Sequence, residues 1–387
     1  MRARRRESDV RRASLMPKKA SNAPVLSRRA VGRATLARQM LLAREKTSSL
    51  DAIERLIGVQ AQLPRPPFVG LWSRVEGFRR EELAELLRRR EVVRATSLRT
   101  TLHLMSARDY VALRGVLAPV LARALASITK ARGATLDVDQ LVAEARPFFA
   151  AQPRDFEAVR AHLAALHPDA DDRAMGYAIR TSLPLVQVPT DDAWSFPAQA
   201  DFALADAWLG TTIDARETAP DALVRRYLAA YGPASVADAQ AWTGLGGLRP
   251  TFDAMQDELR VFADERGREL FDLEGAPHPG EDASAPLRFL PEWDGAIVAR
   301  ADERFVAAEH RQHVFLSALR VAPTVLIDGT VAATWKIDRK KTGATLTVTP
   351  FDTIAKKVRA ELEQEADALL AFHEPDAPKR ALKIAGA

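Results

Sequence analysis

The sequence predicts an α+β, mostly α protein built from three tandem winged helix-turn-helix modules and a C-terminal β-rich segment. Three times along the chain, runs of apolar residues at helical spacing are followed by two short stretches with the pattern of strands. After a proline-rich linker at residues 275–286 the pattern becomes strand-rich. At 387 residues the chain is long enough for several packed modules with substantial cores.

Residues 1–25 form a predicted disordered basic arm. Eight Arg and Lys side chains and few large apolar residues leave this segment unable to bury enough surface to order itself. It contains no apolar stretch typical of a secretory signal, and Met16 is an alternative start to Met1. We expect such an arm to hold nucleic acid without sequence preference.

The first module is predicted over residues 26–133. Helical periodicity covers residues 26–42, and Ser48 and Ser49 offer an N-cap for a second helix that runs to Val59. Three prolines, beginning at position 64, stop that second helix. Two further helices are expected over residues 68–75 and 81–89, and two strands over residues 92–97 and 100–104.

The second and third modules repeat this order without a repeat in the sequence itself. The segment from Ser235 to Trp242, followed by Gly244, most resembles a helix-turn-helix. For residues 134–215 we expect helices over 138–149, 156–166 and 173–181 and strands over 185–188 and 193–196. For residues 216–280 we expect helices over 221–231, 235–242 and 249–259 and strands over 259–262 and 269–273.

The C-terminal segment, residues 281–387, is predicted to be a sheet closed by one helix. Asp328 and Gly329 form a strong two-residue hairpin signal between two of its strands. Strands are expected over residues 287–290, 324–327, 331–336 and 344–349, the helix over 353–372, and a loose tail over 377–387.

Composition excludes several function classes. The chain has no cysteine, and its seven histidines are scattered, so we expect no disulfide, no metal site and no cofactor. No stretch approaches the roughly 18 uninterrupted apolar residues of a membrane span. We therefore expect no membrane association and a cytoplasmic protein.

Charge is distributed unevenly along the chain. Residues 1–133 carry 29 Lys and Arg against 11 Asp and Glu, whereas residues 134–285 carry 12 against 26. A strongly basic first third favours a polyanionic partner such as DNA, through electrostatic attraction to phosphates. Solvated arginines on helix faces would give the same count, so charge alone leaves both interpretations open.

Several short motifs resemble the winged-helix family of AlkZ-type and YcaQ-type DNA glycosylases. The resemblance covers roughly residues 26–372. It includes the segments 70–77, 94–96, 100–104, 290–294 and 326–335, and it centres on Gln60-Ala61-Gln62 ahead of Pro64. It implies a C-shaped scaffold around double-stranded DNA and hydrolysis of the glycosidic bond of alkylated purines, crosslinked ones included. Gln60 and Gln62 match the catalytic motif of the AlkZ type, which has two glutamines.

Two glutamines suit a leaving group that is already cationic. An N7- or N3-alkylated purine can depart without protonation, so an essential carboxylate is not required. Each amide can accept and donate hydrogen bonds, so Gln60 and Gln62 could hold the attacking water beside the oxocarbenium-like sugar. A neutral amide is a poor base, which makes positioning its main role. Residues two apart do not share a helix face, so we expect the motif at a helix end.

Further side chains are candidates for contacts with DNA. A basic turn at Arg339, Lys340 and Lys341 lies between two predicted strands and could reach into a groove. His103 could contact phosphate, but a histidine between two leucines of a strand is more often structural. The remaining candidates are Arg65, next to the glutamine motif, and Arg99, Thr100 and Thr101, near the turn of the first wing, where an exposed turn without function is equally compatible.

The sequence leaves three functions open. The first is a monomeric, nucleoid-associated DNA glycosylase that acts on double-stranded DNA carrying alkylated purines. The second is a non-catalytic winged-helix transcriptional regulator, which would prefer particular undamaged sequences. The third is a protein-interaction scaffold, which would show no salt-dependent affinity for DNA.

Overall fold

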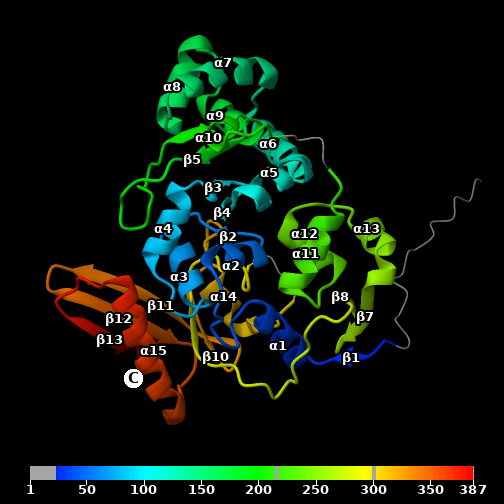
Figure 1. Ribbon diagram of the computed structural model, residues 1–387, viewed down its shortest axis with the longest axis vertical. Helices are drawn as coiled ribbons and strands as arrows, with labels where there is room; N and C mark the ends of the chain where they lie inside the picture. Colours follow the sequence, from blue (N-terminus) through cyan, green and yellow to red (C-terminus); the bar gives the residue numbers. More distant parts are fainter. Residues whose placement is uncertain (1–22, 214–217, 299–301, 387) are drawn as a thin grey trace, which may run out of the picture.

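The computed structural model describes residues 23–213, 218–298 and 302–386, so the predicted basic arm lies almost entirely outside the described residues. The fold is α+β, with helices grouped around three β-sheets (Figure 1). One end of the long axis is formed by helices α7 (Val138–Ala151), α8 (Phe156–Leu166) and α9 (Asp172–Ser182) (Figure 1). These three helices match the predicted positions closely.

The first helical segment follows the predicted order except at its second helix. Ser48 caps that helix, as predicted, because its hydroxyl accepts a hydrogen bond from the backbone N–H of Asp51. The helix then ends at Arg55, earlier than predicted, since Ile57 and Gly58 have positive φ angles of 58° and 90°. The elements are α1 (Arg28–Arg38), α2 (Ser49–Arg55), β2 (Val59–Gln60), α3 (Pro66–Trp72), α4 (Arg80–Arg88), β3 (Val92–Thr96), the 3-10 turn η1 (Leu98–Thr100) and β4 (Leu102–Ser106).

The strands of the first two segments form one sheet rather than two separate wings. Its order is β2-β4-β3-β5-β6, and β5 (Leu185–Gln187) pairs antiparallel with β3, which places Arg94 opposite Gln187. The boundary predicted at residue 133 is therefore bridged by backbone hydrogen bonds. The helices between these strands also include α5 (Ala107–Val116) and α6 (Ala118–Arg132).

The predicted strand over residues 193–196 is wrong. On the side away from β3, β5 pairs with β6 (Phe202–Leu204), which is followed by α10 (Ala205–Leu209). Trp194 lies in a loop, where its ring packs 5.3 Å from that of Phe68 and the Arg80 guanidinium lies 4.0 Å from its centroid. The apolar residues of this loop thus dock onto the first segment instead of pairing as a strand.

The third segment also has the predicted helices and strands, except that the helix predicted over residues 249–259 ends at Ala254 and a 3-10 turn follows it. Ser235 and Asp238 form a capping box at the start of α12, and Gly244 ends that helix with a φ of 79°. Its two strands are joined by a short strand from the chain start, β1, which pairs parallel with β7. The elements are β1 (Val25–Leu26), α11 (Asp221–Tyr231), α12 (Val236–Thr243), α13 (Arg249–Ala254), η2 (Gln256–Glu258), β7 (Leu259–Asp264) and β8 (Glu269–Leu273).

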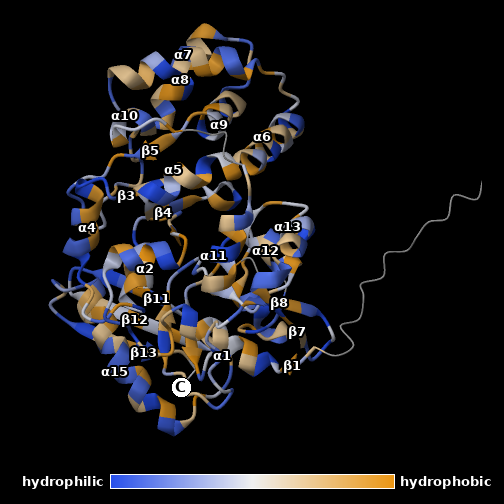
Figure 2. Ribbon diagram, turned by 45° about the vertical axis from the view of Figure 1, so that its right-hand side comes forward, coloured by the Kyte–Doolittle hydropathy of each residue, from blue (hydrophilic) through white to orange (hydrophobic). Residues whose placement is uncertain are grey.

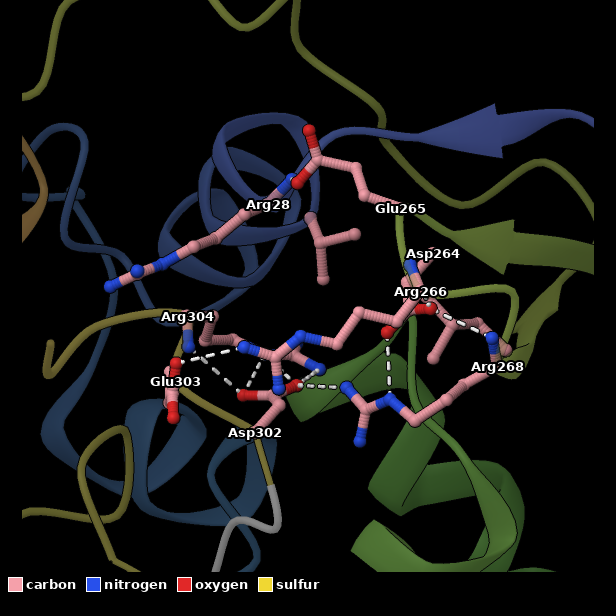
Figure 3. Close-up of a pocket in the computed structure, with 10 residues that line it drawn as sticks. Arg28, Asp264, Glu265, Arg266, Arg268, Asp302, Glu303 and Arg304 are labelled. Atoms are coloured by element: carbon pink, nitrogen blue, oxygen red, sulfur yellow. Dashed lines mark hydrogen bonds and ion pairs between the residues drawn. The ribbon is translucent and has the colours of Figure 1, made fainter. Parts of the chain in front are cut away.

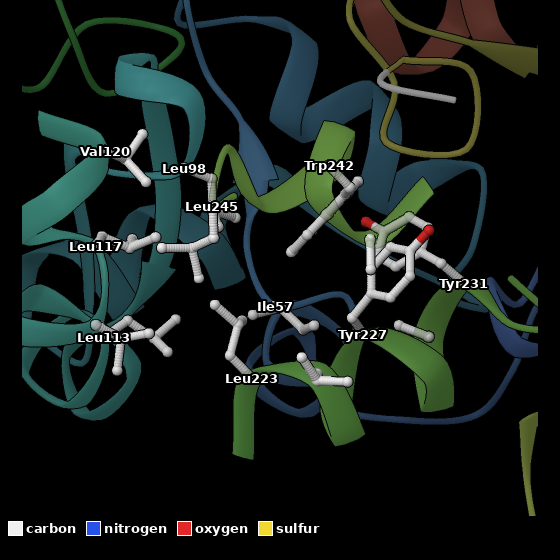
Figure 4. Close-up of a cluster of buried hydrophobic side chains, with 14 of the residues drawn as sticks. Ile57, Leu98, Leu113, Leu117, Val120, Leu223, Tyr227, Tyr231, Trp242 and Leu245 are labelled. Carbon is white, nitrogen blue, oxygen red and sulfur yellow. The ribbon is translucent and has the colours of Figure 1, made fainter. Parts of the chain in front are cut away.

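The largest core joins the first and third segments. Figure 4 shows Leu98 and Leu117 facing Leu223 and Trp242 across this core, with Ile57 between them. All five side chains are buried. Because the apolar surface is shared, the removal of either segment would expose the core of the other.

The C-terminal segment is a five-stranded sheet covered by α15 (Lys356–His373). Its hairpin turn at Asp328 and Gly329 is confirmed, with positive φ angles of 48° and 75° as the two-residue turn requires. Burial alternates along the strands, and Figure 2 shows hydrophobic and hydrophilic residues mixed in this region. The other elements are β9 (Arg288–Leu290), η3 (Ala308–His310), α14 (Arg311–Val314), β10 (Thr324–Ile327), β11 (Thr330–Lys340) and β12 (Gly343–Pro350).

The predicted loose tail is also wrong. Residues Arg380–Ile384 form β13, which pairs parallel with β12 at the edge of the C-terminal sheet. Leu382 and Ile384 pack against the core beneath α15. Burial of these two side chains and the ladder hydrogen bonds hold the segment in place.

Buried arginine–aspartate pairs connect distant segments. Arg38 of α1 binds Asp272 of β8 at 2.6 Å, and both side chains are almost fully buried. Figure 3 shows a pocket nearby where Arg268 reaches Asp302, the partner of Arg304. These pairs fasten the first helix, the third segment and the following loop together.

Among the described residues, no single helix has the length and apolar composition of a membrane span. Helices α5 and α6 reach that length and composition only when they are taken together, and they meet at a bend of 65°.

Candidate active site and nucleic-acid interface

Gln60 ends a short strand and Gln62 follows it at a bend, so the prediction of a helix end is wrong. Gln60 is the second residue of β2, and Pro66 begins the next helix instead of ending the previous one. A residue with a Cβ could not replace Gly58, because that atom would lie 2.9 Å from the carbonyl oxygen of Leu104. Gln60 is buried and Gln62 is exposed, so the two amides differ in their access to solvent.

Gln60 is held from two sides. It pairs with His103 across β2 and β4, and only 7% of its surface is exposed. Its Oε1 accepts a hydrogen bond from Arg99 Nη2 at 2.8 Å. Arg99 Nη1 in turn donates to the carbonyl oxygen of Trp242 at 2.6 Å, near the C-terminal end of α12, where a cation is favoured. The third segment thus fixes the position of Gln60 through Arg99.

Gln62 is exposed and is anchored by main-chain contacts. Its Oε1 accepts a hydrogen bond from the backbone N–H of Leu102 at 3.0 Å. The buried side chain of Arg94 donates from Nε to the carbonyl oxygen of Ala61 at 2.9 Å and from Nη2 to that of Gln62 at 3.2 Å. Arg94 lies in one of the segments that carry the family resemblance but was not predicted as a site residue, although an arginine in an otherwise apolar strand was the available signal.

These contacts determine which amide atoms of the motif are left to meet a ligand. Arg99 and the Leu102 N–H are donors, so the atom facing each of them must be the amide oxygen. Among the described residues, neither Gln60 Nε2 nor Gln62 Nε2 has a hydrogen-bond partner. Each amide therefore presents its NH2 group and one remaining oxygen lone pair.

The turn after β3 brings several predicted residues to the motif. Arg99 and Thr100 have positive φ angles of 52° and 61°, an uncommon backbone conformation for residues other than glycine. Burial lowers the pKa of Arg99 to about 10, which leaves it charged at neutral pH. The hydroxyls of Thr100 and Thr101 donate to the carbonyl oxygens of Arg99 and Leu98. Arg99 and His103 thus lie beside Gln60, and Thr101 contacts His103 from the same turn.

The other predicted DNA contacts lie apart from this cluster. Arg65 is partly exposed and its Nη2 lies 3.5 Å from Glu292 Oε1. The basic turn joins β11 and β12, where Lys340 and Lys341 are exposed and Arg339 pairs with Glu374 at 3.2 Å. Within the described part of the chain, no group of His, Asp and Glu side chains is arranged to hold a metal ion.

Residues 53–372 match the family model described as DNA glycosylase AlkZ-like. The chain belongs to this AlkZ-like family. The resemblance seen in the sequence is therefore confirmed, and the protein is a DNA glycosylase, a hydrolase of N-glycosyl bonds. Family membership favours the enzyme over the regulator and the scaffold.

A relative and a solved structure support the AlkZ-like assignment. The "Interstrand DNA cross-link repair glycosylase" of Streptomyces sahachiroi is 30% identical over 356 residues, which cover 85% of this chain and 92% of the relative. The structure of the S. sahachiroi DNA glycosylase AlkZ matches 93% of this chain and all of that one with a TM-score of 0.76. At 23% identity, this likeness establishes a shared fold.

His103 is a neutral member of the site in this AlkZ-like glycosylase. Its side chain is only 2% exposed, and its Nδ1 lies 3.2 Å from the carbonyl oxygen of Thr101. Burial and, second, the charge of Arg99 lower the pKa of His103 to about 3. A neutral imidazole cannot supply a positive charge to a phosphate at neutral pH.

We expect His103→Gln to reduce the loss of stability in mild acid. The folded protein keeps His103 neutral down to about pH 3, whereas the unfolded chain takes up a proton below about pH 6.5. The free energy of unfolding therefore falls as the pH falls from 6.5, and His103 contributes about 1.4 kcal/mol per pH unit to that slope. Urea denaturation between pH 4.5 and 6 measures the slope. Identical slopes for the two proteins would contradict the lowered pKa, and measurements above pH 7.5 serve as the control.

Proposed function

We propose that this DNA glycosylase hydrolyses the N-glycosidic bond of cationic alkylated purines in double-stranded DNA, interstrand crosslinks included. The observation that carries the proposal is the anchoring of both amide oxygens of the motif, Gln60 by Arg99 and Gln62 by the Leu102 N–H. The S. sahachiroi relative, named an interstrand crosslink repair glycosylase, supports the substrate class. The enzyme needs no cofactor and acts as a monomer on the DNA of the nucleoid.

The glutamines act mainly by positioning. The free NH2 group and the remaining oxygen lone pair of each amide give Gln60 and Gln62 the donors and acceptors to orient one water toward the anomeric carbon. The charge of Arg99 on the Gln60 oxygen weakens any stabilisation of the cationic sugar by that atom. Departure of the cationic base supplies the driving force, and the proton of the attacking water passes to solvent.

The scaffold we propose is three winged-helix modules in a C shape around the DNA. The three runs of helices followed by paired strands support this arrangement. The basic turn of β11 and β12 and the N-terminal arm then supply contacts to the phosphates. In the sheet shared by the first two segments, the glutamine motif belongs to the first module, because β2 is the edge strand farthest from β5 and β6.

Duplex DNA with a single N7-methylguanine tests the proposed reaction. We expect incubation with the purified protein, followed by alkaline cleavage of abasic sites, to yield one product at the modified position. A duplex crosslinked by a nitrogen mustard should be unhooked by the same reaction. The absence of abasic product from both substrates would refute the proposed substrate class, and an unmodified duplex is the control.

We expect Lys340→Ser combined with Lys341→Ser to weaken DNA binding at every sequence. Loss of two phosphate contacts reduces the slope of log affinity against log salt by about 2. Fluorescence anisotropy at several salt concentrations measures that slope. The matched control is Lys356→Ser with Lys357→Ser, which removes two exposed lysines from the closing helix. An equal change of slope in both double variants would show that the basic turn contributes no more to DNA binding than other exposed lysines.

We expect Arg99→Met to slow hydrolysis without weakening DNA binding. The substitution keeps the length of the side chain but removes both donors, so Gln60 loses its anchor to α12. A displaced amide lowers the single-turnover rate by about 10- to 100-fold. Arg99→Lys retains one donor and the charge, so its rate should lie between those of the wild type and Arg99→Met. Weaker binding with an unchanged rate would instead make Arg99 a DNA contact.

A further inference from the structure

A second polar pocket lies beside Gln62, between the first and second segments. It encloses about 250 Å³. Its floor is a row of side chains directly opposite one another on three strands, Arg94 of β3, Gln187 of β5 and Phe202 of β6. Arg180 of α9 forms one wall, and Gln62 lies at the rim. The pocket therefore opens next to the glutamine motif.

Two arginines in this pocket lack an acidic partner. Arg94 is 3% exposed and donates only to carbonyl oxygens, and Arg180 stacks 4.2 Å from the ring centroid of Phe156. Among the described residues, neither guanidinium is within ion-pair distance of a carboxylate. Three other buried arginines, Arg38, Arg74 and Arg304, each bind an aspartate at 2.5–2.7 Å. The buried Arg114 also donates only to carbonyl oxygens, those of Thr181 and Ser182.

Burial without an anion is unfavourable for a charged side chain. It lowers the pKa of Arg94 to about 10 and is also the main reason that the pKa of Arg180 is lowered. The nearby Asp155 carboxylate is occupied as the N-cap of α8, where it accepts a hydrogen bond from Ala158 N at 2.7 Å, and Glu157 is exposed. Both carboxylates line the pocket, but among the described residues neither forms an ion pair with Arg94 or Arg180.

Gln187 provides a second, independent indication of a ligand. Its side chain is 7% exposed, and its buried Oε1 has no hydrogen-bond partner. Among the described residues its Nε2 has none either. Since a buried amide without partners is costly and an amide can turn to present its NH2 group, Gln187 is ready to donate to an anion bound beside Arg94 and Arg180.

We propose that this pocket binds one backbone phosphate of the DNA strand whose base is removed, with Arg180 and Gln187 as its ligands. The proposal rests on the proposed function, because the glycosylase substrate supplies a phosphate close to the motif. Phosphate contacts fix the register of a strand without reading its sequence. A DNA strand held by this phosphate would present its sugar to Gln62. Arg94, in the same pocket, binds the backbone carbonyl oxygen of Gln62.

Replacement of single phosphates by neutral methylphosphonates tests the proposal. The probe is a duplex with a tetrahydrofuran abasic analogue, which binds but cannot be hydrolysed, so the result does not depend on activity. We expect one position flanking the analogue at which the methylphosphonate weakens wild-type binding about tenfold. Arg180→Met keeps the aliphatic part of the side chain. This variant should bind the unmodified probe about tenfold less tightly, and a methylphosphonate at that position should not weaken its binding further. Arg173→Met, an exposed arginine at the other end of α9, is the control and should keep the sensitivity.

Gln187→Glu provides a test in which stability and binding move in opposite directions. A carboxylate beside Arg94 and Arg180 would supply the missing anion, so we expect a higher melting temperature together with at least tenfold weaker DNA binding. A lower melting temperature, or unchanged binding, would overturn the proposal.

Two other occupants of the pocket can be distinguished. Thermal stabilisation of the wild type by free 7-methylguanine, lost in Gln187→Leu, would identify a base pocket and overturn the proposal. Stabilisation by inorganic phosphate with no methylphosphonate-sensitive position would show an adventitious ion only and would also overturn it. If the phosphate contact is found but N7-methylguanine is not released, the proposed reaction is refuted while the assignment of this pocket as a phosphate site is supported.

Discussion

Gln60→Ala and Gln62→Ala each lower the single-turnover rate of N7-methylguanine release by roughly 10²–10³-fold, the effect typical of removing one preorganised polar group from an active site. In the proposed mechanism each substitution deletes an amide that orients the attacking water, while the anchoring groups Arg99 and Leu102 stay in place. Because the two amides hold one water, the double variant should be little slower than either single variant. Quench-flow or manual sampling with enzyme in excess over DNA measures the rates.

The control for these variants is Gln140→Ala. Gln140 is an exposed glutamine on α7 that bonds only to neighbouring groups of its own helix, so its removal should leave the rate unchanged. Affinity for the tetrahydrofuran duplex should also be nearly the same in all variants, since the glutamines act on the chemical step. Rates equal to wild type in the double variant would rule out the catalytic assignment.

Asp294→Ala should destabilise the fold by about 3–5 kcal/mol, the cost of leaving a buried charge without its partner. Arg74 Nη1 and Nη2 donate to the two oxygens of Asp294 at 2.8 and 2.7 Å, and both side chains are at most 2% exposed. The pair fastens the helix after the glutamine motif to the loop that follows β9. Urea denaturation at pH 7.5 measures the free energy of unfolding.

Two comparisons isolate the buried charge. Arg74→Met combined with Asp294→Leu removes both charges, so it should be more stable than Asp294→Ala alone. Glu363→Ala breaks the exposed pair with Arg359 on α15 and should cost less than about 0.5 kcal/mol. If Asp294→Ala lowers the free energy of unfolding no more than Glu363→Ala does, the buried pair does not stabilise the fold as proposed.

Local signals in the sequence predicted most helices well. Ser48 and Ser235 start helices because their hydroxyls satisfy backbone N–H groups of the first turn, a property of the residues themselves. The turn at Asp328 and Gly329 is equally local, because few residues tolerate two successive positive φ angles. The predicted positions of these features needed no knowledge of distant contacts.

The strands were harder to predict because their partners are distant in sequence. β13 is a short apolar alternation at the end of the chain, and only its pairing with β12 and burial beneath α15 distinguish it from a tail. Likewise the apolar residues around Trp194 resemble a strand, yet their burial comes from a loop docked on another segment. Pattern alone cannot separate these two cases.

By itself, the sequence determined the family and most of the helices, since motifs and capping residues are local, and it singled out the two glutamines as candidates. Only the tertiary structure decided what surrounds Gln60-Ala61-Gln62. It placed the motif at the end of a strand, brought Arg99 from the wing turn to anchor Gln60, and joined two wings into one sheet that aligns Arg94 with Gln187. The physical reason is that hydrogen-bond partners and buried charges must be satisfied across the whole fold, so the geometry of the site depends on contacts between residues more than a hundred positions apart.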